Sequence, residues 1–319
     1  MKKKILITGC AGFIGSNLVD FFLKKNIEIV GLDNLSTGNI RFLHSALKNK
    51  KFKFYKKDLF KSEISSYFKN INTVYHLAAN ADVRFGLKHT KKDIDQNIIV
   101  THKVLEAMRK NNVKKIMFSS TGSVYGESSQ IPTKENAPFP IQTSLYGASK
   151  TSAEGLISAY CEGFNFKSYI FRFVSVLGER YSHGHVFDFV KQLKNNKKKL
   201  YVLGDGNQRK SYLNIFDSIN AIYKSMNYFN DKINIINLGT NESLTVKESI
   251  KIICDTLKCK PKLLFKGGKR GWVGDNPLIF LDTKKIRKSG WRPSFTIKES
   301  IKITTKYLLD NQWILKRKT

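Results

Sequence analysis

Residues 4–15, KILITGCAGFIG, pass from a short apolar run into three glycines, Gly9, Gly12 and Gly15, at GxxGxxG spacing. This pattern predicts a strand, a tight turn and a helix that starts near Phe13. Small residues let the backbone approach a pyrophosphate, whose charge meets the amide groups and positive dipole end of the helix. The segment therefore predicts a parallel βαβ unit that binds a dinucleotide.

Asp33 ends the next predicted strand and gives a second, independent indication. A carboxylate at that place can accept hydrogen bonds from both ribose hydroxyls and would repel a 2′-phosphate. An ordinary loop or cap aspartate is the alternative interpretation, and Arg41 is the nearest residue that could change the choice. The pattern favours NAD over NADP as the cofactor.

The rest of the chain extends this alternating pattern. From residue 4 to residue 173, short β-branched or aromatic runs alternate with longer helical ones, which is typical of parallel βαβ units. The predicted strands are 4–8, 27–32, 52–56, 72–77, 114–119 and 168–173. We predict an α/β fold with a Rossmann-like, doubly wound parallel sheet and a smaller, mixed C-terminal domain. Residues 1–175, rejoined by 211–239, would form the first domain, and residues 176–210 and 240–319 the second. Thr296 would cap a final helix.

Composition excludes several classes of protein. The 319 residues carry a formal charge of +31, but the lysines are spread along the chain and no nucleic-acid reader motif accompanies them. We expect no nucleic-acid partner, although a positive field would attract an anionic substrate. The four cysteines lack CxxC spacing, and we expect no metal. With no secretory leader and no stretch that could span a bilayer, a cytoplasmic protein without membrane contact is expected.

The segment YGASK, residues 146–150, places a phenol and an ammonium four positions apart. Positions i and i+4 share one face of a helix, so Lys150 can hold its charge near the Tyr146 hydroxyl. That charge favours the phenolate, and a tyrosine whose usual pKa is about 10 could then accept a proton from an alcohol near neutral pH. A tyrosine and a lysine at this spacing, taken alone, are most often ordinary surface residues, but the glycine loop upstream favours a catalytic role for Tyr146 and Lys150.

Together with Asp58-Leu59, residues 76–79 (HLAA), Asn97 and residues 119–121 (SST), these motifs resemble the extended short-chain dehydrogenase/reductases, the NAD-dependent epimerase/dehydratase family. The resemblance covers nearly the whole chain. It implies that Thr121, Tyr146 and Lys150 are catalytic, that Lys150 holds the nicotinamide ribose, and that Asn97 begins a helix and braces the site. The NAD-binding residues that we predict are Gly9, Gly12, Phe13, Ile14, Gly15, Asp33, Asn34, Asp58, Leu59, Leu77, Ala78, Ala79, Asn97, Tyr146 and Lys150.

The two residues after Thr121 narrow the chemistry. The 4,6-dehydratases of the family carry acidic residues there, whereas this chain has Gly122 and Ser123, which cannot protonate a leaving hydroxide. The resemblance then implies oxidation at C4 of a nucleotide-linked sugar to a 4-keto sugar, most simply by a 4-epimerase in surface-polysaccharide synthesis. The alternative is a net 4-dehydrogenase of a sugar such as a GDP-heptose. A 4,6-dehydratase and a non-catalytic NAD-sensing protein are weaker alternatives.

The second domain would bind a UDP- or GDP-linked sugar. The residues that we predict to contact the substrate are Arg84, Thr121, Ser175, His185, Arg209, Lys210 and Arg270. Guanidinium and ammonium groups suit the two phosphates, although a solvated basic residue is the alternative at each position. Ser175 stands where the family often has Asn, and Lys210 where it has Arg, so the usual contacts are in doubt. By resemblance, the helix that carries Tyr146 would form a homodimer or a higher homo-oligomer.

Overall fold

The computed structural model describes residues 3–80, 86, 88–138, 141–271, 276 and 278–316. The chain forms two compact units. Unit 1 comprises Met1–Val124, Ser144–Arg172 and Ile222–Ile236, and unit 2 comprises Tyr125–Thr143, Phe173–Ala221 and Asn237–Thr319. The predicted division into an NAD-binding and a sugar-binding domain stays a prediction.

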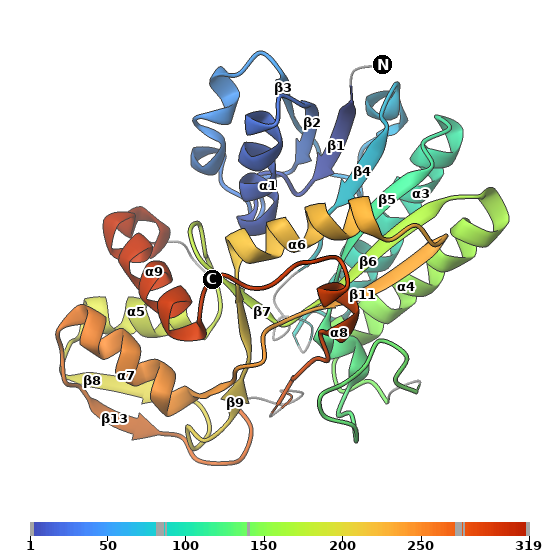
Figure 1. The fold of residues 1–319 in the computed structure, drawn as a ribbon. Coiled ribbons are helices and arrows are strands. Elements are labelled where there is room, and N and C mark those ends of the chain that lie inside the picture. Colours follow the sequence, from blue (N-terminus) through green and yellow to red (C-terminus); the bar gives the residue numbers. More distant parts are fainter. Residues whose placement is uncertain are drawn as a thin grey trace. The chain divides into compact units, whose positions relative to one another are not determined.

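Unit 1 is built on a seven-stranded sheet in the order β11-β6-β5-β4-β1-β2-β3 (Figure 1). Its strands are β1 (Lys4–Thr8), β2 (Glu28–Asp33), β3 (Phe52–Lys56), β4 (Thr73–His76), β5 (Lys115–Thr121), β6 (Lys167–Phe173) and β11 (Ile233–Leu238). Neighbouring strands from β5 to β3 are parallel. The predicted Rossmann-like sheet is therefore confirmed, and β5 runs to Thr121 rather than ending at residue 119.

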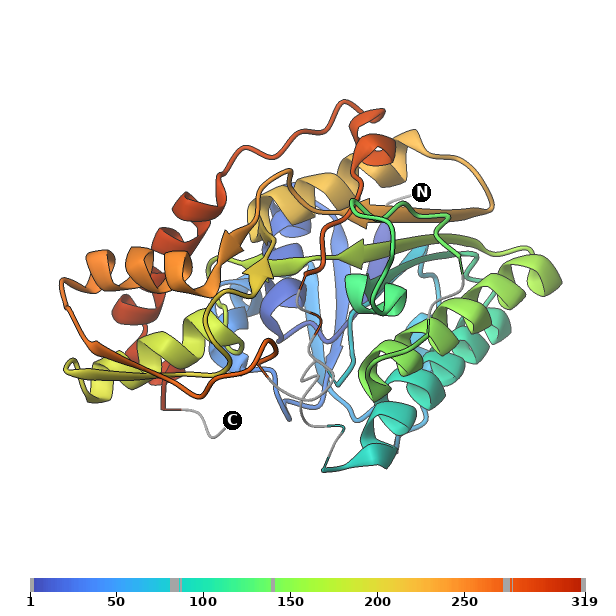
Figure 2. The ribbon, with the colours of Figure 1, turned by 90° about the horizontal axis from the view of Figure 1, so that it is seen from below.

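Helices cover both faces of this sheet (Figure 2). Helices α1 (Phe13–Lys24) and α6 (Ile215–Tyr228) share one face, where the rings of Phe21 and Tyr223 lie 5.4 Å apart. Helices α3 (Val100–Lys110) and α4 (Leu145–Phe164) lie on the other. Val104 of α3 and Ile157 of α4 pack with Ile116 of β5 in one buried apolar cluster. Burial of such side chains contributes about 1.5–3 kcal/mol each and fixes the helices on the sheet.

Unit 2 contains three two-stranded sheets. The pairs are β7 (Ser175–Leu177) with β10 (Tyr212–Asn214), β9 (Arg209–Lys210) with β12 (Leu244–Thr245), and β8 (Lys199–Val202) with β13 (Lys262–Phe265). Residues 211–239, which we predict to rejoin the first domain, form a strand, a helix and a strand, but the first of these strands, β10, pairs with β7 rather than joining the large sheet.

The remaining helices of unit 2 are α5 (His185–Asn195), α7 (Val246–Leu257), α8 (Lys284–Arg287) and α9 (Ile297–Asp310). Thr296 caps α9 as predicted, because its side-chain oxygen accepts from the Glu299 N–H at 3.2 Å while the Glu299 carboxylate accepts from the Thr296 N–H at 2.8 Å. Thr245 and Glu248 make the same capping box at the start of α7.

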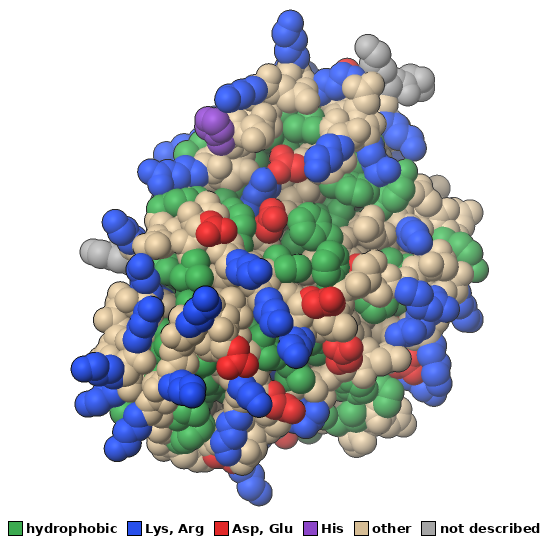
Figure 3. Space-filling view, turned by 60° about the vertical axis from the view of Figure 1, so that its left-hand side comes forward, with side chains coloured by type: hydrophobic (Ala, Val, Ile, Leu, Met, Phe, Trp, Pro, Cys, Tyr) green, Lys and Arg blue, Asp and Glu red, His purple; other side chains and the backbone are tan. Residues whose placement is uncertain are grey.

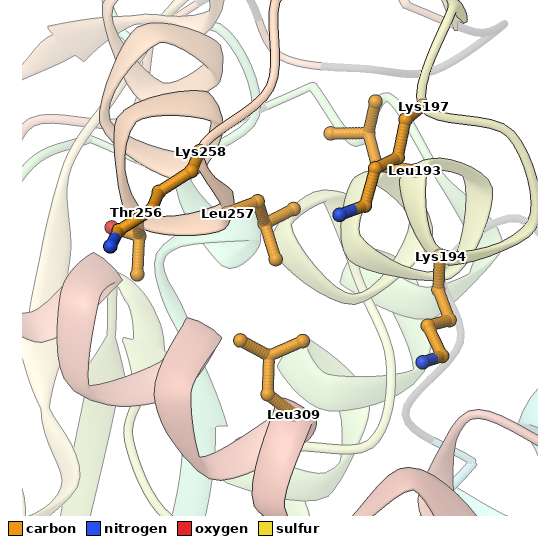
Figure 4. Close-up of a pocket in the computed structure, with 7 residues that line it drawn as sticks. All are labelled: Leu193, Lys194, Lys197, Thr256, Leu257, Lys258 and Leu309. Atoms are coloured by element: carbon orange, nitrogen blue, oxygen red, sulfur yellow. The ribbon is translucent and has the colours of Figure 1, made fainter.

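Two surface features of the molecule bear on function. On the face shown in Figure 3, Lys and Arg side chains are scattered, with Asp and Glu among them, rather than gathered into a stripe. A cavity of about 190 Å³ lies among α5, α7 and α9, where Leu193, Leu257 and Leu309 line it and lysines stand around it (Figure 4). None of the predicted site residues that the structure describes lines this cavity.

Within the described residues, no helix combines the length and apolar character that crossing a membrane requires.

Candidate functional site

The glycine turn after β1 is as tight as the sequence pattern requires. Gly9 has a φ of +68°, and its N–H donates to the Leu32 carbonyl oxygen at 2.8 Å. A Cβ on Gly15 would lie 2.1 Å from the Gly9 carbonyl oxygen, and a Cβ on Gly9 would lie 2.8 Å from the Ala78 nitrogen. Larger side chains are therefore excluded at both positions, which leaves the backbone accessible to a bulky anionic ligand.

The N-terminus of α1 and Asp33 complete the features expected around a dinucleotide. Gly12 caps α1 without a side-chain hydrogen bond, and the first turn carries no acidic residue. The buried Asp33 carboxylate accepts from the Ala11 N–H at 2.9 Å and from the Leu35 N–H at 2.7 Å. These two bonds fix the carboxylate beside the glycine turn, at the end of β2. The residues present fit an adenosine ribose and a pyrophosphate.

Other predicted cofactor residues surround this turn. The N–H groups of Leu77 and Ala78 donate to the Thr8 side-chain oxygen at 3.1 and 3.2 Å, so the end of β4 is tied to the end of β1. Asn34 donates to the Asp58 carboxylate at 3.2 Å, and Leu59 beside it is buried. The structure thus gathers these predicted residues around the carboxyl ends of β1, β2, β3 and β4.

A buried histidine links this region to α3. The ring nitrogens of His76 lie 2.8 Å from the Thr8 hydroxyl and 3.0 Å from the Thr101 hydroxyl. Burial, aided by the charge of Lys150, lowers the pKa of His76 to about 3. The ring is therefore neutral at physiological pH and connects two hydroxyl groups across the sheet.

The prediction that Asn97 begins a helix is wrong. Asn97 lies inside one continuous helical run, formed by α2 (Thr90–Asp93), a π-helical segment (Ile94–Ile99) and α3. Its side chain accepts from the Asn80 N–H at 2.8 Å and donates to the Ser149 hydroxyl at 2.8 Å. Asn97 lies in the wider π-helical turn, where its side chain is buried. Its one amide therefore joins the loop after β4 to helix α4.

A side-chain hydrogen bond with Thr121 is one of the causes that set the pKa of Tyr146, so the two side chains lie next to each other. The predicted role of Thr121 in orienting a substrate hydroxyl stays a prediction. The Ser144 side chain accepts from the Gly147 N–H at 3.0 Å and so caps α4 beside Tyr146. Burial of the hydroxyl and the nearby charge of Asp93 raise the pKa of Tyr146 above its usual range, and the bond with Thr121 lowers it. The phenol is therefore protonated at neutral pH in this arrangement.

Lys150 is only 2% exposed, and its ammonium donates to the Ser119 carbonyl oxygen at 2.8 Å. It also lies 4.6 Å from the centre of the Phe118 ring. Burial lowers its pKa to about 7, against the opposing charges of Glu154 and Asp93. Burial and Asp93 dominate the pKa of Tyr146 in this structure, so the predicted lowering of that pKa by Lys150 stays a prediction.

The predicted substrate residues of unit 2 fall into separate groups. His185 and Lys210 form one, because burial and the charge of Lys210 lower the pKa of His185 to about 3. The Tyr212 hydroxyl lies 2.6 Å from the His185 Nδ1, and Ser175 is the strand partner of Tyr212. The Lys210 ammonium donates to the Asn276 carbonyl oxygen at 2.9 Å.

Arg209 and Arg270, the two arginines of unit 2 that we predict to contact the substrate, bind other protein groups in this structure. Arg209 donates to the Ser243 hydroxyl at 3.0 Å and to its carbonyl oxygen at 2.8 Å, while Arg270 forms an exposed ion pair with Glu127 at 2.5 Å. The first contact holds Arg209 across the β9–β12 pair. Arg84 lies outside the described residues, so its predicted role stays a prediction.

Sequence reasoning missed several residues beside the catalytic group. Asp93 is buried and accepts from the Asn80 side chain at 2.8 Å, and Glu154 is buried on α4. One signal was available for each: Asp93 precedes Asn97 by one helical turn, and Glu154 follows Lys150 by one helical turn on a face that must be buried. Ser149 gave no such signal, because small polar residues are common on any helix.

Comparison with known proteins places this geometry in context. The model of the "NAD dependent epimerase/dehydratase family" matches residues 5–239. A putative UDP-glucose 4-epimerase of Methanocaldococcus jannaschii is 33% identical over 96% of this chain and 99% of its own length. A dTDP-D-glucose 4,6-dehydratase of Dictyostelium discoideum is 35% identical, over 69% of this chain and 54% of its own. The crystal structure of UDP-glucuronic acid 4-epimerase from Bacillus cereus, in complex with UDP-glucuronic acid and NAD, is 28% identical over 97% of this chain and 99% of that one, with a TM-score of 0.89.

Proposed function

Because this chain belongs to the NAD-dependent epimerase/dehydratase family, we propose that it is a nucleotide-sugar 4-epimerase. Family membership confirms the predicted family, the prediction that the chain is an enzyme, and NAD as its cofactor. The finer proposal concerns the substrate, the carbon that reacts and the fate of the product.

The placement of Thr121 next to Tyr146, with Lys150 held on the same strand by the Ser119 carbonyl oxygen, is the observation that carries the proposal. A sugar hydroxyl that takes its place between these two groups can donate its proton to Tyr146 while Thr121 orients it. When bound, NAD supplies the hydride acceptor and donor for the same carbon. Lys150 lies one helical turn from Tyr146 and, while protonated, supplies the positive charge that a phenolate needs.

Two features favour redox at one carbon over elimination of water. Thr121 is followed by Gly122 and Ser123, and the Ser123 N–H donates to the Thr121 side-chain oxygen at 3.1 Å. This turn brings no carboxylic acid next to Thr121, so it offers no group that could protonate a leaving hydroxide. The 4-keto sugar would therefore be reduced again on its other face, which gives the C4 epimer.

The relatives support UDP-linked sugars as the first substrates to test, because the Methanocaldococcus jannaschii protein is named a putative UDP-glucose 4-epimerase and the Bacillus cereus structure contains UDP-glucuronic acid. Lys210 and Ser175, which depart from the family pattern, keep a second candidate in view. That candidate is a 4-dehydrogenase that releases the keto sugar, for example from a GDP-heptose. Surface-polysaccharide synthesis and a homodimer or higher homo-oligomer remain part of the proposal on resemblance. A cytoplasmic location remains part of it as an expectation from the sequence.

The test is mass spectrometry of the purified protein incubated with UDP- and GDP-linked hexoses and heptoses, while NADH absorbance is followed. An epimerase gives a product of unchanged mass and no lasting NADH signal. A product two hydrogens lighter, with NADH retained, would instead identify a dehydrogenase. Loss of one water from any of these substrates would contradict the argument from Gly122 and Ser123.

A further inference from the structure

Strand β5 and helix α4 meet through three consecutive strand residues. The Ser119 carbonyl oxygen accepts from Lys150, the Ser120 hydroxyl donates to the Glu154 carboxylate, and Thr121 lies next to Tyr146. The three helix residues follow one another at four-residue intervals, so they form a single line along one face of α4. Two of these contacts belong to the proposed catalytic residues, and the third involves Glu154.

Glu154 is held more firmly than a surface carboxylate. Arg172 of β6 forms a forked contact with it, with an Nη2 to Oε2 distance of 2.6 Å and an Nε to Oε1 distance of 3.1 Å. The side chains of Arg172 and Glu154 are only 13% and 7% exposed. A paired guanidinium of this kind fixes both the position and the orientation of the carboxylate. Glu154 therefore joins α4 to β5 and β6 at the same time.

On the proposed function, we infer that Glu154 is a positioning residue for catalysis: held by Arg172 and Ser120, it sets the register of α4 on β5 and presents a negative charge to Lys150. A slip of α4 along β5 would separate Tyr146 from Thr121 and Lys150 from Ser119 together, because all three contacts share one helix face. One side chain, Glu154, thus controls both the register of α4 on β5 and the negative charge near Lys150.

The charged groups around Lys150 come from several elements. Glu154 and Asp93 raise its pKa, whereas burial lowers it to about 7. His76 of β4 is neutral, since its pKa is about 3, and Tyr146 is a neutral phenol. Arg172 forms an ion pair with Glu154 and so weakens the effect of the Glu154 charge on Lys150. Without Glu154, Asp93 alone would oppose the effect of burial, and Lys150 would lose its proton at a lower pH.

The test compares Glu154→Gln, which keeps the shape and removes the charge, with Glu154→Asp, which keeps the charge. Glu162→Gln is the matched control, because Glu162 lies on the same helix and pairs with Lys232 in solvent. The double variant Glu154→Gln with Arg172→Gln removes both charges of this buried ion pair, so Arg172 is not left without a partner carboxylate. It covers the case in which the single variant does not fold. For each variant, NADH affinity is measured by fluorescence titration from pH 6 to pH 9, together with the thermal unfolding midpoint.

We expect wild-type NADH affinity to fall as Lys150 loses its charge. The midpoint of that fall should lie at least half a pH unit lower in Glu154→Gln and in the double variant, should recover in Glu154→Asp, and should not move in Glu162→Gln. An affinity that does not change with pH in the wild type, or the same midpoint in all variants, overturns the inference. A lower unfolding midpoint with an unmoved pH profile also overturns it, because Glu154 would then be merely structural. NADH binding needs no sugar, so a wrong substrate proposal leaves this test intact.

Discussion

Lys150 and Ser119 are joined by a 2.8 Å hydrogen bond from the ammonium to the carbonyl oxygen, on the strand that ends at Thr121. The bond anchors the lysine to the strand that carries the proposed hydroxyl-orienting residue. It also means that a buried ammonium is held in place by a backbone dipole, with Glu154 and Asp93 as the nearby charges that stabilise it.

Replacement of Tyr146 by Phe removes the hydroxyl that would accept the substrate proton. We expect turnover of the active nucleotide sugar to fall by about 10³-fold or more, with NADH binding retained, because the loss concerns proton transfer rather than cofactor contacts. Tyr160→Phe is the control, since Tyr160 lies on the same helix and donates to Glu106 at 2.7 Å. Full turnover by Tyr146→Phe would exclude the assigned role.

Replacement of Lys150 by Met should abolish turnover and stabilise the fold. The pKa of Lys150 is lowered to about 7 in the folded state, so between pH 7 and its ordinary value near 10.5 the unfolded chain binds more protons and stability rises with pH. Below pH 7 the full cost of the buried charge remains. We therefore expect the variant to melt about 2–6 °C higher at pH 6.5, with the difference shrinking at pH 9. A lower melting temperature at pH 6.5 would refute this.

Replacement of Asp33 by Asn removes the carboxylate but keeps its shape. We expect NAD affinity to fall by about 10-fold to 100-fold, because ribose hydroxyls would lose a charged acceptor, and discrimination against NADP to weaken. Isothermal titration with both cofactors measures each change. Asp205→Asn is the control, since the Asp205 carboxylate is bonded to Asn207 in a turn of unit 2. Unchanged preference for NAD would count against the ribose contact.

Two glycine-to-alanine changes should act in opposite directions. Gly15→Ala would place a Cβ 2.1 Å from the Gly9 carbonyl oxygen, so the turn must distort, and we expect a loss of about 2 kcal/mol or more in unfolding free energy together with weaker NADH binding. Gly155→Ala on α4 meets no atom within 4 Å, and it should stabilise by about 1 kcal/mol through helix propensity. Urea unfolding of both variants measures the two changes in unfolding free energy. A change of the same sign in both variants would contradict the prediction.

Acid should destabilise the protein through two buried histidines. The pKa values of His76 and His185 are lowered to about 3, so between pH 6.5 and pH 3 the unfolded chain binds more protons than the folded one. The contribution of these histidines to the unfolding free energy is fully present above pH 6.5. It falls toward pH 3 by about 1.4 kcal/mol per pH unit for each histidine. Urea unfolding at pH 7.5 and pH 5 should show a smaller loss in His76→Gln than in the wild type. His44→Gln, at an exposed position, should lose as much as the wild type.

Much of the fold of unit 1 could be predicted because its signals are local. The apolar strands and the glycine spacing of residues 4–15 depend on neighbours within one turn or one strand, and so does the cap that Thr296 gives to α9 in unit 2. The pairing of β10 with β7 could not be predicted in the same way, because three-residue strands carry too little pattern to fix their partners. The prediction that Asn97 begins a helix rests on the family resemblance, and no residue pattern could have corrected it, because none distinguishes a π-helical turn from an α-helical one.

The sequence by itself determined the family and the cofactor, because the glycine turn and Asp33 stand at spacings that local geometry fixes. The same motifs predict the roles of Thr121, Tyr146 and Lys150. Only the tertiary structure decided how those groups are charged. Burial, Asp93 and Glu154 set the pKa values of Tyr146 and Lys150, and these contacts join segments that no short-range pattern connects. Desolvation depends on everything that packs around a group, which is a property of the folded chain rather than of its sequence motifs.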